Sequence, residues 1–288
     1  MREFLWKLDS TDSFIIRIIS SIEIPVMILT LFALCALIKS NRSTPVFVIH
    51  LILSDLIQII CRLTFTFTRS WDAYIAYWYS LIVGVYFMAC VAFERFLLVS
   101  HPIWYRSHHS LKVCCVVSVI IWFVPLIFAV ISFTDSCLIP YPIIILCFVG
   151  TCRGLSRAIS LTSLKRKKIL GSLFLVLLTY TFLILPFIIL TFIYTSGYDS
   201  YSPLFYISWR YSEYLVFLNP LADCVLYMFL RPDVGGLMKS VHCCCRTDTH
   251  QSSTHSRDEH SRDSSAAFVC CVSMQKPASH SQTDCSSV

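Results

Sequence analysis

The stretch KKILGSLFLVLLTYTFLILPFIILTFIY, Lys167 to Tyr194, determines the class of fold that this sequence can adopt. Two lysines open it, and no charged residue occurs from Ile169 to Tyr194. Because a helix needs about 20 apolar residues to cross a hydrocarbon core of about 30 Å, the stretch predicts a membrane-spanning helix. Pro186 interrupts it without turn residues nearby, and a proline inside a helix removes a backbone hydrogen bond and kinks the helix.

The rest of the chain has the same apolar character. Of its 288 residues, 56% are hydrophobic and 14% are charged, and the mean hydropathy is +0.70. A soluble domain carries about 25% charged residues, so this composition predicts a membrane protein. Seven stretches are long enough to cross a bilayer, which predicts an all-α membrane protein with a seven-transmembrane helix bundle. The expected spans are residues 14–38, 46–68, 74–100, 112–133, 137–158, 168–195 and 203–230.

The distribution of basic residues predicts the orientation of the chain. Lysines and arginines concentrate in the first, third and fifth connections, whereas the opposite loops contain Arg69 alone. The positive-inside rule therefore places the amino terminus outside the cell and the carboxyl terminus in the cytoplasm. We expect a short extracellular tail at 1–13, the seven-span domain at 14–230, a juxtamembrane helix and palmitoylation segment at 231–246, and a disordered cytoplasmic tail at 247–288.

The third expected span ends in the sequence CVAFERFLLVSHPIWY. Glu94, Arg95 and Phe96 in it resemble the Asp/Glu-Arg-Tyr motif of rhodopsin-like (class A) G-protein-coupled receptors, and Pro102 follows at the family's spacing. The alternative interpretation is an interfacial ion pair that snorkels to the lipid headgroups. The resemblance implies that Glu94 holds Arg95 by a charge-assisted hydrogen bond at rest. It assigns the contact with the G protein to Glu94, Arg95, Phe96, Pro102 and Ile103.

Two aspartates lie inside apolar stretches, where a charged side chain is costly and needs a partner. Asp55 belongs to HLILSDLIQ in the second expected span, and Asp223 belongs to NPLADCVLYMF in the seventh. The resemblance implies that Asp55, Asn219 and Asp223 bind a sodium ion, although the third-span position that usually adds a hydroxyl is Gly84. The alternative is a hydrogen-bonded acid pair that only packs helices, because two carboxylates repel each other without a proton or a cation.

The resemblance also implies where the bundle moves on activation. Pro186 corresponds to the family's sixth-span proline, the pivot of an outward swing, and Tyr180 replaces the usual phenylalanine six residues earlier. In the seventh span Asp223 fits the pattern Asn-x-x-x-Asp-Pro-x-x-Tyr, but Cys224 replaces its proline. Pro220 precedes the aspartate instead, which predicts a weak point one turn earlier. The expected activation switch comprises Tyr180, Pro186, Pro220, Asp223 and Tyr227.

The expected outer side departs from the family. No cysteine lies between Thr64 and Phe87, so the disulfide that usually ties the third span to the second outer loop cannot form. The resemblance is nearest to the purinergic-like and proton-sensing-like branch, but every histidine lies on the expected inner side, where it cannot sense external pH. Glu23 in the first span is an acid without an assigned partner. The expected ligand pocket comprises Tyr77, Trp78, Phe187, Thr191, Trp209, Arg210 and Glu213.

The segment after the last span contains candidate modification and binding sites. Three adjacent cysteines close to the membrane predict palmitoylation: Cys243, Cys244 and Cys245. The serine-rich sequence beyond them is a candidate for phosphorylation and arrestin binding. The final residues, Ser286-Ser287-Val288, are a candidate ligand for a PDZ protein.

These features predict a plasma-membrane receptor that transduces an unidentified extracellular ligand to a heterotrimeric G protein by outward motion of the sixth helix. The membrane lipids are its surroundings, and we expect no catalytic residues, no nucleic-acid partner and no cofactor besides a sodium ion. Two alternatives remain open. The chain could be a decoy receptor that does not signal, or a small proton or cation transporter that uses Asp55 and Asp223.

Overall fold

The structure is a computed structural model of the whole chain, and it describes residues 10–39, 45–108, 110–128, 133–157, 163–197 and 202–230. The chain divides into two units, Met1–Val234 and Gly235–Val288. All described residues belong to the first unit, so the predicted palmitoylation segment, the serine-rich tail and the final PDZ-type residues lie outside the described residues.

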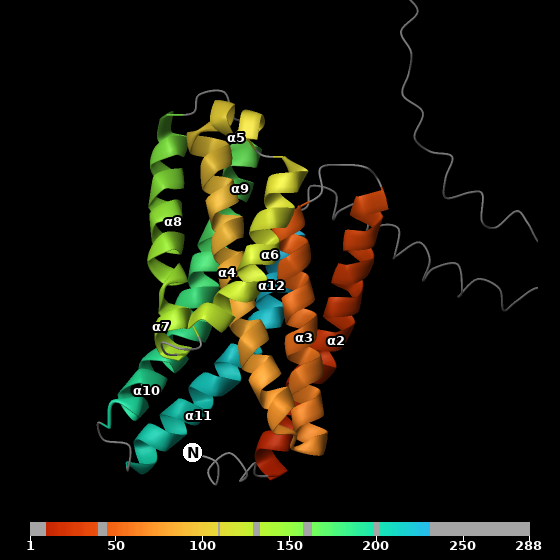
Figure 1. Cartoon of the computed structure of the whole chain (residues 1–288), viewed down its shortest axis with the longest axis vertical. Coiled ribbons are helices and arrows are strands. Elements are labelled where there is room, and N and C mark those ends of the chain that lie inside the picture. Colours follow the sequence, from red (N-terminus) through yellow and green to blue (C-terminus); the bar gives the residue numbers. More distant parts are fainter. Residues whose placement is uncertain are drawn as a thin grey trace, which may run out of the picture. The chain divides into compact units, whose positions relative to one another are not determined.

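The described part of the chain is helical, with no strand in it, as the sequence predicts (Figure 1). Helices run antiparallel to one another along most of the bundle, and the two long amino-terminal helices stand at one side of it. The elements are α2 (Ser10–Lys39), α3 (Val46–Thr68), α4 (Trp71–Ser100), α5 (Pro102–His108), α6 (Leu111–Phe128), α7 (Phe133–Leu138), α8 (Pro140–Arg157), α9 (Ser163–Thr179), the π-helical turn η1 (Tyr180–Ile184), α10 (Leu185–Thr195), α11 (Pro203–Phe217) and α12 (Asn219–Leu230).

Several helices could cross a membrane, which is compatible with a multi-pass membrane protein. Within the described ranges, five segments have the necessary length and apolar composition: Asp12–Ala36, Val46–Thr68, Trp71–Ser100, Asp135–Leu155 and Arg166–Thr195. Large apolar side chains cover their outer faces, as Phe32 and Leu146 illustrate with 68% and 71% of their surface exposed. Such a surface is stable only against another apolar phase.

Two of the seven expected spans are shorter in the structure. The fourth corresponds to an apolar helix of fewer residues, Leu111–Leu126. The seventh is divided at Leu218 into α11 and α12, which contain 15 and 12 residues. The all-helical fold is therefore confirmed for the described residues, and their apolar helices are compatible with the predicted membrane-protein class. The count of seven spans stays a prediction.

The last two expected spans each contain a proline near the middle, and both are irregular there. The π-helical turn η1 directly precedes Pro186, which lies in the first turn of α10. In the last segment Leu218 forms a turn two residues before Pro220. Because proline has no N–H to donate, a carbonyl in the preceding turn loses its helical partner at each site. Each of these two helices is therefore weakest near the middle of its length.

Helix α4 is in contact with α3, α6, α8 and α9, and glycines allow a close approach to α8. A Cβ atom at Gly150 of α8 would lie 2.5 Å from the ring of Phe96 in α4. One at Gly154 would lie 2.7 Å from the hydroxyl of Ser100. The spacing is the small-xxx-small pattern by which membrane helices bring their backbones together. Phe96, expected at a G-protein contact, therefore packs into the α4–α8 interface.

Candidate functional site

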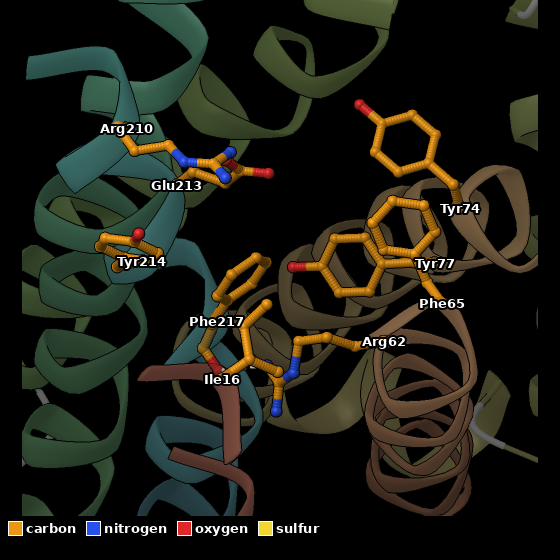
Figure 2. Close-up of a pocket in the computed structure, with 9 residues that line it drawn as sticks. All are labelled: Ile16, Arg62, Phe65, Tyr74, Tyr77, Arg210, Glu213, Tyr214 and Phe217. Carbon is orange, nitrogen blue, oxygen red and sulfur yellow. Dashed lines mark hydrogen bonds and ion pairs between the residues drawn. The ribbon is translucent and has the colours of Figure 1, made fainter. Parts of the chain in front are cut away.

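A pocket lies at the end of the bundle where α2 begins and α3 ends, and it holds about 390 Å³ of space that protein does not fill, part of it open (Figure 2). Four helices contribute to it, so a ligand inside would touch elements far apart in the sequence. The lining residues are Ile16 from α2, Arg62 and Phe65 from α3, Tyr74 and Tyr77 from α4, and Arg210, Glu213, Tyr214 and Phe217 from α11.

Arg62 forms the floor of this pocket and joins three helices. One terminal nitrogen donates to the carbonyl oxygen of Phe217 at 2.9 Å. The other donates to the hydroxyl of Ser20 at 3.3 Å and forms an ion pair with Glu23, and both charged side chains are almost completely buried. Phe217 is the last residue of α11, so Arg62 satisfies a carbonyl that the helix end leaves without an intrahelical donor. The guanidinium also lies over the Phe217 ring, 5.1 Å from its centroid.

Glu23 therefore has the partner that the sequence alone did not assign to it. A buried charge in a membrane-type helix has to be paired, and Arg62 supplies the opposite charge from the neighbouring helix. The sequence carries a signal for this pair, since Arg62 is a basic residue in the middle of the second apolar stretch. Among residues that line the pocket, it is the main one that sequence reasoning missed.

A second cluster of charges fixes the beginning of α2 against α11. Arg210 donates from Nε to Asp12 at 3.3 Å and from one terminal nitrogen to Glu213 at 2.7 Å, and its other terminal nitrogen also bonds Asp12. Tyr214 donates its hydroxyl to the same aspartate. Each nitrogen of the Arg210 guanidinium is thus engaged by a carboxylate of this cluster.

A buried polar core lies next to these clusters, between α3, α4 and α12. Asp55 accepts a hydrogen bond from the amide of Gln58 at 3.1 Å, and Asp223 accepts one from the amide of Asn219 at 3.2 Å. The two carboxylates are close enough to repel each other. A Cβ atom at Gly84 would lie 3.1 Å from the Ser54 hydroxyl oxygen and 3.2 Å from the Gln58 amide nitrogen, so these two side chains fill the space beside this glycine.

The oxygen atoms of this core fit a proton or a hard cation. Three buried acceptors in it have no hydrogen-bond partner among the described residues: one oxygen of Asp55 and the amide oxygens of Gln58 and Asn219. Within the part of the chain that the structure describes, no group of three or more His, Cys, Asp and Glu side chains could hold a metal ion. A cation here would therefore depend on amide oxygens in addition to Asp55 and Asp223, which suits an ion that prefers oxygen ligands.

The predicted ligand-pocket residues divide into two groups. Tyr77, Arg210 and Glu213 line the pocket. The other predicted residues pack beside it as an aromatic cluster between α4, α10 and α11. In this cluster Trp78 stacks on Phe187 with ring centroids 4.9 Å apart, and Trp209 donates to the Thr191 hydroxyl at 3.2 Å.

At the other end of α4, Glu94 contacts Tyr105 instead of the expected partner, Arg95. Glu94 accepts a hydrogen bond from the hydroxyl of Tyr105 in α5 at 3.0 Å, and no ion pair between the described residues joins it to Arg95. Burial and the Glu94 carboxylate raise the pKa of Tyr105, so its hydroxyl remains a donor at neutral pH. The buried Nε of Arg95 has no hydrogen-bond partner in the described ranges. Beside this site Ile103 is 85% exposed.

Of the residues predicted to form the activation switch, Tyr180, Pro186 and Pro220 lie at irregular points of the fold, whereas Asp223 and Tyr227 lie within α12. Tyr180 in η1 is completely buried, donates its hydroxyl to the carbonyl of Cys137, and stacks on Tyr141 with centroids 4.9 Å apart. Pro220 is buried at the beginning of α12, and Tyr227 is buried near its end. Tyr180 thus ties the sixth expected span to the fifth at the level of the kink.

No protein-family model matches this chain, and no curated protein is significantly similar to it. The resemblance to rhodopsin-like receptors therefore depends on the motifs and on their placement in the helices.

Proposed function

We propose that the protein is a rhodopsin-like receptor that activates a heterotrimeric G protein. The observation that carries the proposal is the position of two sites on one helix. Tyr77 lines the pocket at one end of α4, and Arg95 lies 18 residues further along the same helix, which corresponds to about 27 Å. A transmembrane signal requires a ligand site on one side of the membrane and a partner site on the other. The pocket and Arg95 would provide these two sites at opposite ends of α4.

The signal would be a population shift between two arrangements of the bundle. A ligand in the pocket touches α11 directly, and α11 ends at the break before Pro220. In one arrangement α12 is displaced and the sixth expected span, formed by α9, η1 and α10, is moved outward. A ligand that binds better to this arrangement raises its population. The Asp55, Asn219 and Asp223 oxygens would then release or rebind a sodium ion, since their spacing depends on the position of α12 relative to α3.

In this proposal the pocket faces the outside of the plasma membrane and Arg95 faces the cytoplasm. Arg95 and the exposed Ile103 would contact the G protein, since no ion pair among the described residues holds Arg95 and the apolar Ile103 side chain is open to a partner. Palmitoylation at Cys243, Cys244 and Cys245, arrestin binding and PDZ binding remain proposals for the tail.

The test is nucleotide exchange on G proteins in membranes that contain the full chain, with Arg95→Ala compared with Arg153→Ala. Both arginines are near the same end of the bundle, and Arg153 is an exposed residue of α8. We expect basal or serum-stimulated exchange with the wild type and with Arg153→Ala, and none with Arg95→Ala. If the wild type supports neither basal nor stimulated exchange, the decoy receptor becomes the better interpretation.

One observation favours a second candidate function, a proton or cation transporter. Asp55 and Asp223 are buried side by side with unpartnered oxygens around them among the described residues, as in a relay site. Flux assays in liposomes containing the purified chain address it directly. A transporter predicts flux that Asp55→Asn abolishes, whereas the receptor predicts no flux in either protein.

A further inference from the structure

We propose that the pocket binds a small organic cation, an ammonium group on an aromatic or aliphatic body, through Glu213, Tyr77 and the surrounding rings. This proposal names the ligand class of the same site and rests on the proposed receptor function for its physiological meaning. The binding itself follows from the contacts of the pocket and can be measured without a G protein.

The pocket contains a carboxylate oxygen and a hydroxyl that a hydrogen-bond donor on a ligand would satisfy. Arg210 bonds one oxygen of Glu213, and the other oxygen has no hydrogen bond among the described residues. Figure 2 shows one carboxylate oxygen of Glu213 pointing into the space between α11 and the aromatic wall of α4. The hydroxyl of Tyr77 is buried, points into the same space and has no hydrogen-bond partner within the described ranges. A ligand that donates hydrogen bonds satisfies both groups.

The basic groups of the pocket are already engaged by other protein groups, apart from one N–H of Arg62. The nitrogens of Arg210 bond Asp12 and Glu213. The terminal nitrogens of Arg62 bond Glu23, Ser20 and the Phe217 carbonyl, which leaves only its Nε–H. An anionic ligand would have to displace buried carboxylates from their guanidinium partners, and separating a buried pair is costly. A cation needs no such rearrangement.

Aromatic side chains line much of the pocket. A cation within about 6 Å of a ring centroid is attracted to the ring face, and the attraction increases when water is excluded. The rings of Tyr77 and Phe217 come from opposite walls and meet with centroids 5.7 Å apart. The aromatic lining residues are Phe65, Tyr74, Tyr77, Tyr214 and Phe217. Phe217 and Tyr214 already face the guanidinium groups of Arg62 and Arg210. The rings that a ligand cation could use are therefore those of Phe65, Tyr74 and Tyr77.

The size of the pocket limits the ligand to a small one. The unfilled space of about 390 Å³ around the lining residues includes open solvent, so the enclosed part of the pocket is much smaller than this. Part of that space is open, so a single ring with a short amine chain fits better than a nucleotide or a peptide.

The test uses the full chain in lipid nanodiscs and three probes with the same skeleton: 2-phenylethylammonium, 2-phenylethanol and phenylacetate. Binding is measured by calorimetry and by the rise in unfolding temperature that a ligand of the folded state produces. We expect the ammonium to bind at least about tenfold more tightly than the alcohol, which corresponds to 1.4 kcal/mol, and phenylacetate to bind least. Equal binding of the ammonium and the alcohol, tighter binding of phenylacetate, or no binding of any probe overturns the proposal. These comparisons need no variant.

Variants then locate the site. Glu213→Gln should weaken ammonium binding by at least about tenfold, and Tyr77→Phe by about two- to tenfold, the effect of one lost hydrogen bond. Asp72→Asn is the matched control, because Asp72 is an exposed acid near the same end of α4. Unchanged binding in a folded Glu213→Gln protein, or an equal loss in Asp72→Asn, would place the cation elsewhere.

The failure of this proposal can be distinguished from the failure of the receptor function. Arg95→Ala should bind 2-phenylethylammonium like the wild type while it loses nucleotide exchange. Cation binding without any exchange in the wild type leaves the site intact and removes the receptor function. Serum-stimulated exchange without cation binding removes the ligand class and leaves the receptor function intact.

Discussion

At the scale of single residues, the most consequential contact is that of Arg62. Its guanidinium pairs with Glu23 and donates to the carbonyl of Phe217, so one side chain connects α2 and α3 to the end of α11. Both charges are buried, and a carbonyl at a helix end depends on the same group. Removing one partner therefore leaves an uncompensated charge and an unsatisfied acceptor together.

We expect Arg62→Met to lower the free energy of unfolding by about 3–5 kcal/mol, the usual cost of breaking a buried pair by removing one partner. Thermal and denaturant unfolding in detergent measure the change. Arg153→Met is the control, since Arg153 is exposed on α8 and should cost less than about 1 kcal/mol. The double variant Arg62→Met with Glu23→Gln should recover part of the loss. A double variant that is no more stable than Arg62→Met alone would contradict the pairing.

Sequence reasoning identified several charged residues of the site but not their partners. Asp55, Asp223 and Glu213 are recognisable because any charge inside an apolar stretch is itself a signal. Glu23 pairs with Arg62 because the two residues lie at the same level of α2 and α3. The composition of the two apolar stretches does not reveal how their helices align. The Phe217 carbonyl is a backbone atom made available by the helix break, and no side-chain pattern marks it.

At the scale of elements, two glycines of α8 let that helix approach α4 closely. A Cβ atom at Gly150 would lie 2.5 Å from the Phe96 ring, closer than a side chain can tolerate without movement. A Cβ atom at Gly171 in α9 would meet no described atom within 4 Å, so this glycine has free space around it. The two glycines form a matched pair for testing the interface.

Gly150→Ala should destabilise the protein by about 1–3 kcal/mol, because the added methyl group overpacks the interface with Phe96. Gly171→Ala should be neutral or stabilising, since alanine costs less backbone entropy in a helix than glycine. Unfolding temperatures of the two purified variants decide between these outcomes. Equal stabilities would show that α4 and α8 do not pack as closely as described.

The sixth expected span is held to the fifth by a hydrogen bond from Tyr180 to the carbonyl of Cys137. The sequence predicted its kink from Pro186, but the π-helical turn η1 and the bond from Tyr180 to the Cys137 carbonyl were not foreseen. Their positions depend on how α7 and α8 pack against this helix, and a hydroxyl in an apolar run does not reveal which carbonyl it meets. The tie restrains the helix at the place where the proposed outward swing begins.

Tyr180→Phe removes this hydroxyl and leaves the ring that stacks on Tyr141. We expect a loss of stability of about 0.5–1.5 kcal/mol, the net contribution of one hydrogen bond. If the tie restrains the swing, basal nucleotide exchange should rise in the same variant, whereas Tyr194→Phe in α10 should leave it unchanged. Lower stability with unchanged exchange would assign Tyr180 a role in packing alone.

At the scale of the whole molecule, hydropathy predicted most helices well and left their number open. The second expected span, 46–68, coincides with α3 (Val46–Thr68), and the third begins at Trp71 instead of residue 74. Charged residues and turns mark these boundaries. The last expected span is broken at Leu218, and α6 contains 18 residues, so neither is an unambiguous crossing by length. Length and composition leave five, six or seven crossings open.

Reporter fusions along the chain determine this number. A phosphatase that is active only outside the cytoplasm and a fluorescent protein that matures only inside it are fused in turn after Ser70, after Gly197 and at the carboxyl terminus. Seven crossings with an external amino terminus predict that Ser70 and Gly197 are outside and Val288 is inside. If α6 does not cross and α11 and α12 only re-enter, Gly197 and Val288 are both inside.

If α6 crosses and the last segment does not, both Gly197 and Val288 are outside, so each topology gives a different set of signals.

We expect the seven-crossing result for a physical reason. Arg62 bonds a carbonyl of α11, and Asp55 of α3 lies close to Asp223 of α12. A membrane tolerates such buried polar groups only when protein surrounds them at depth. A last segment that stayed at the surface would leave Arg62 without the Phe217 carbonyl. Fusions that place Gly197 and Val288 on the same side of the membrane would therefore also contradict the pocket.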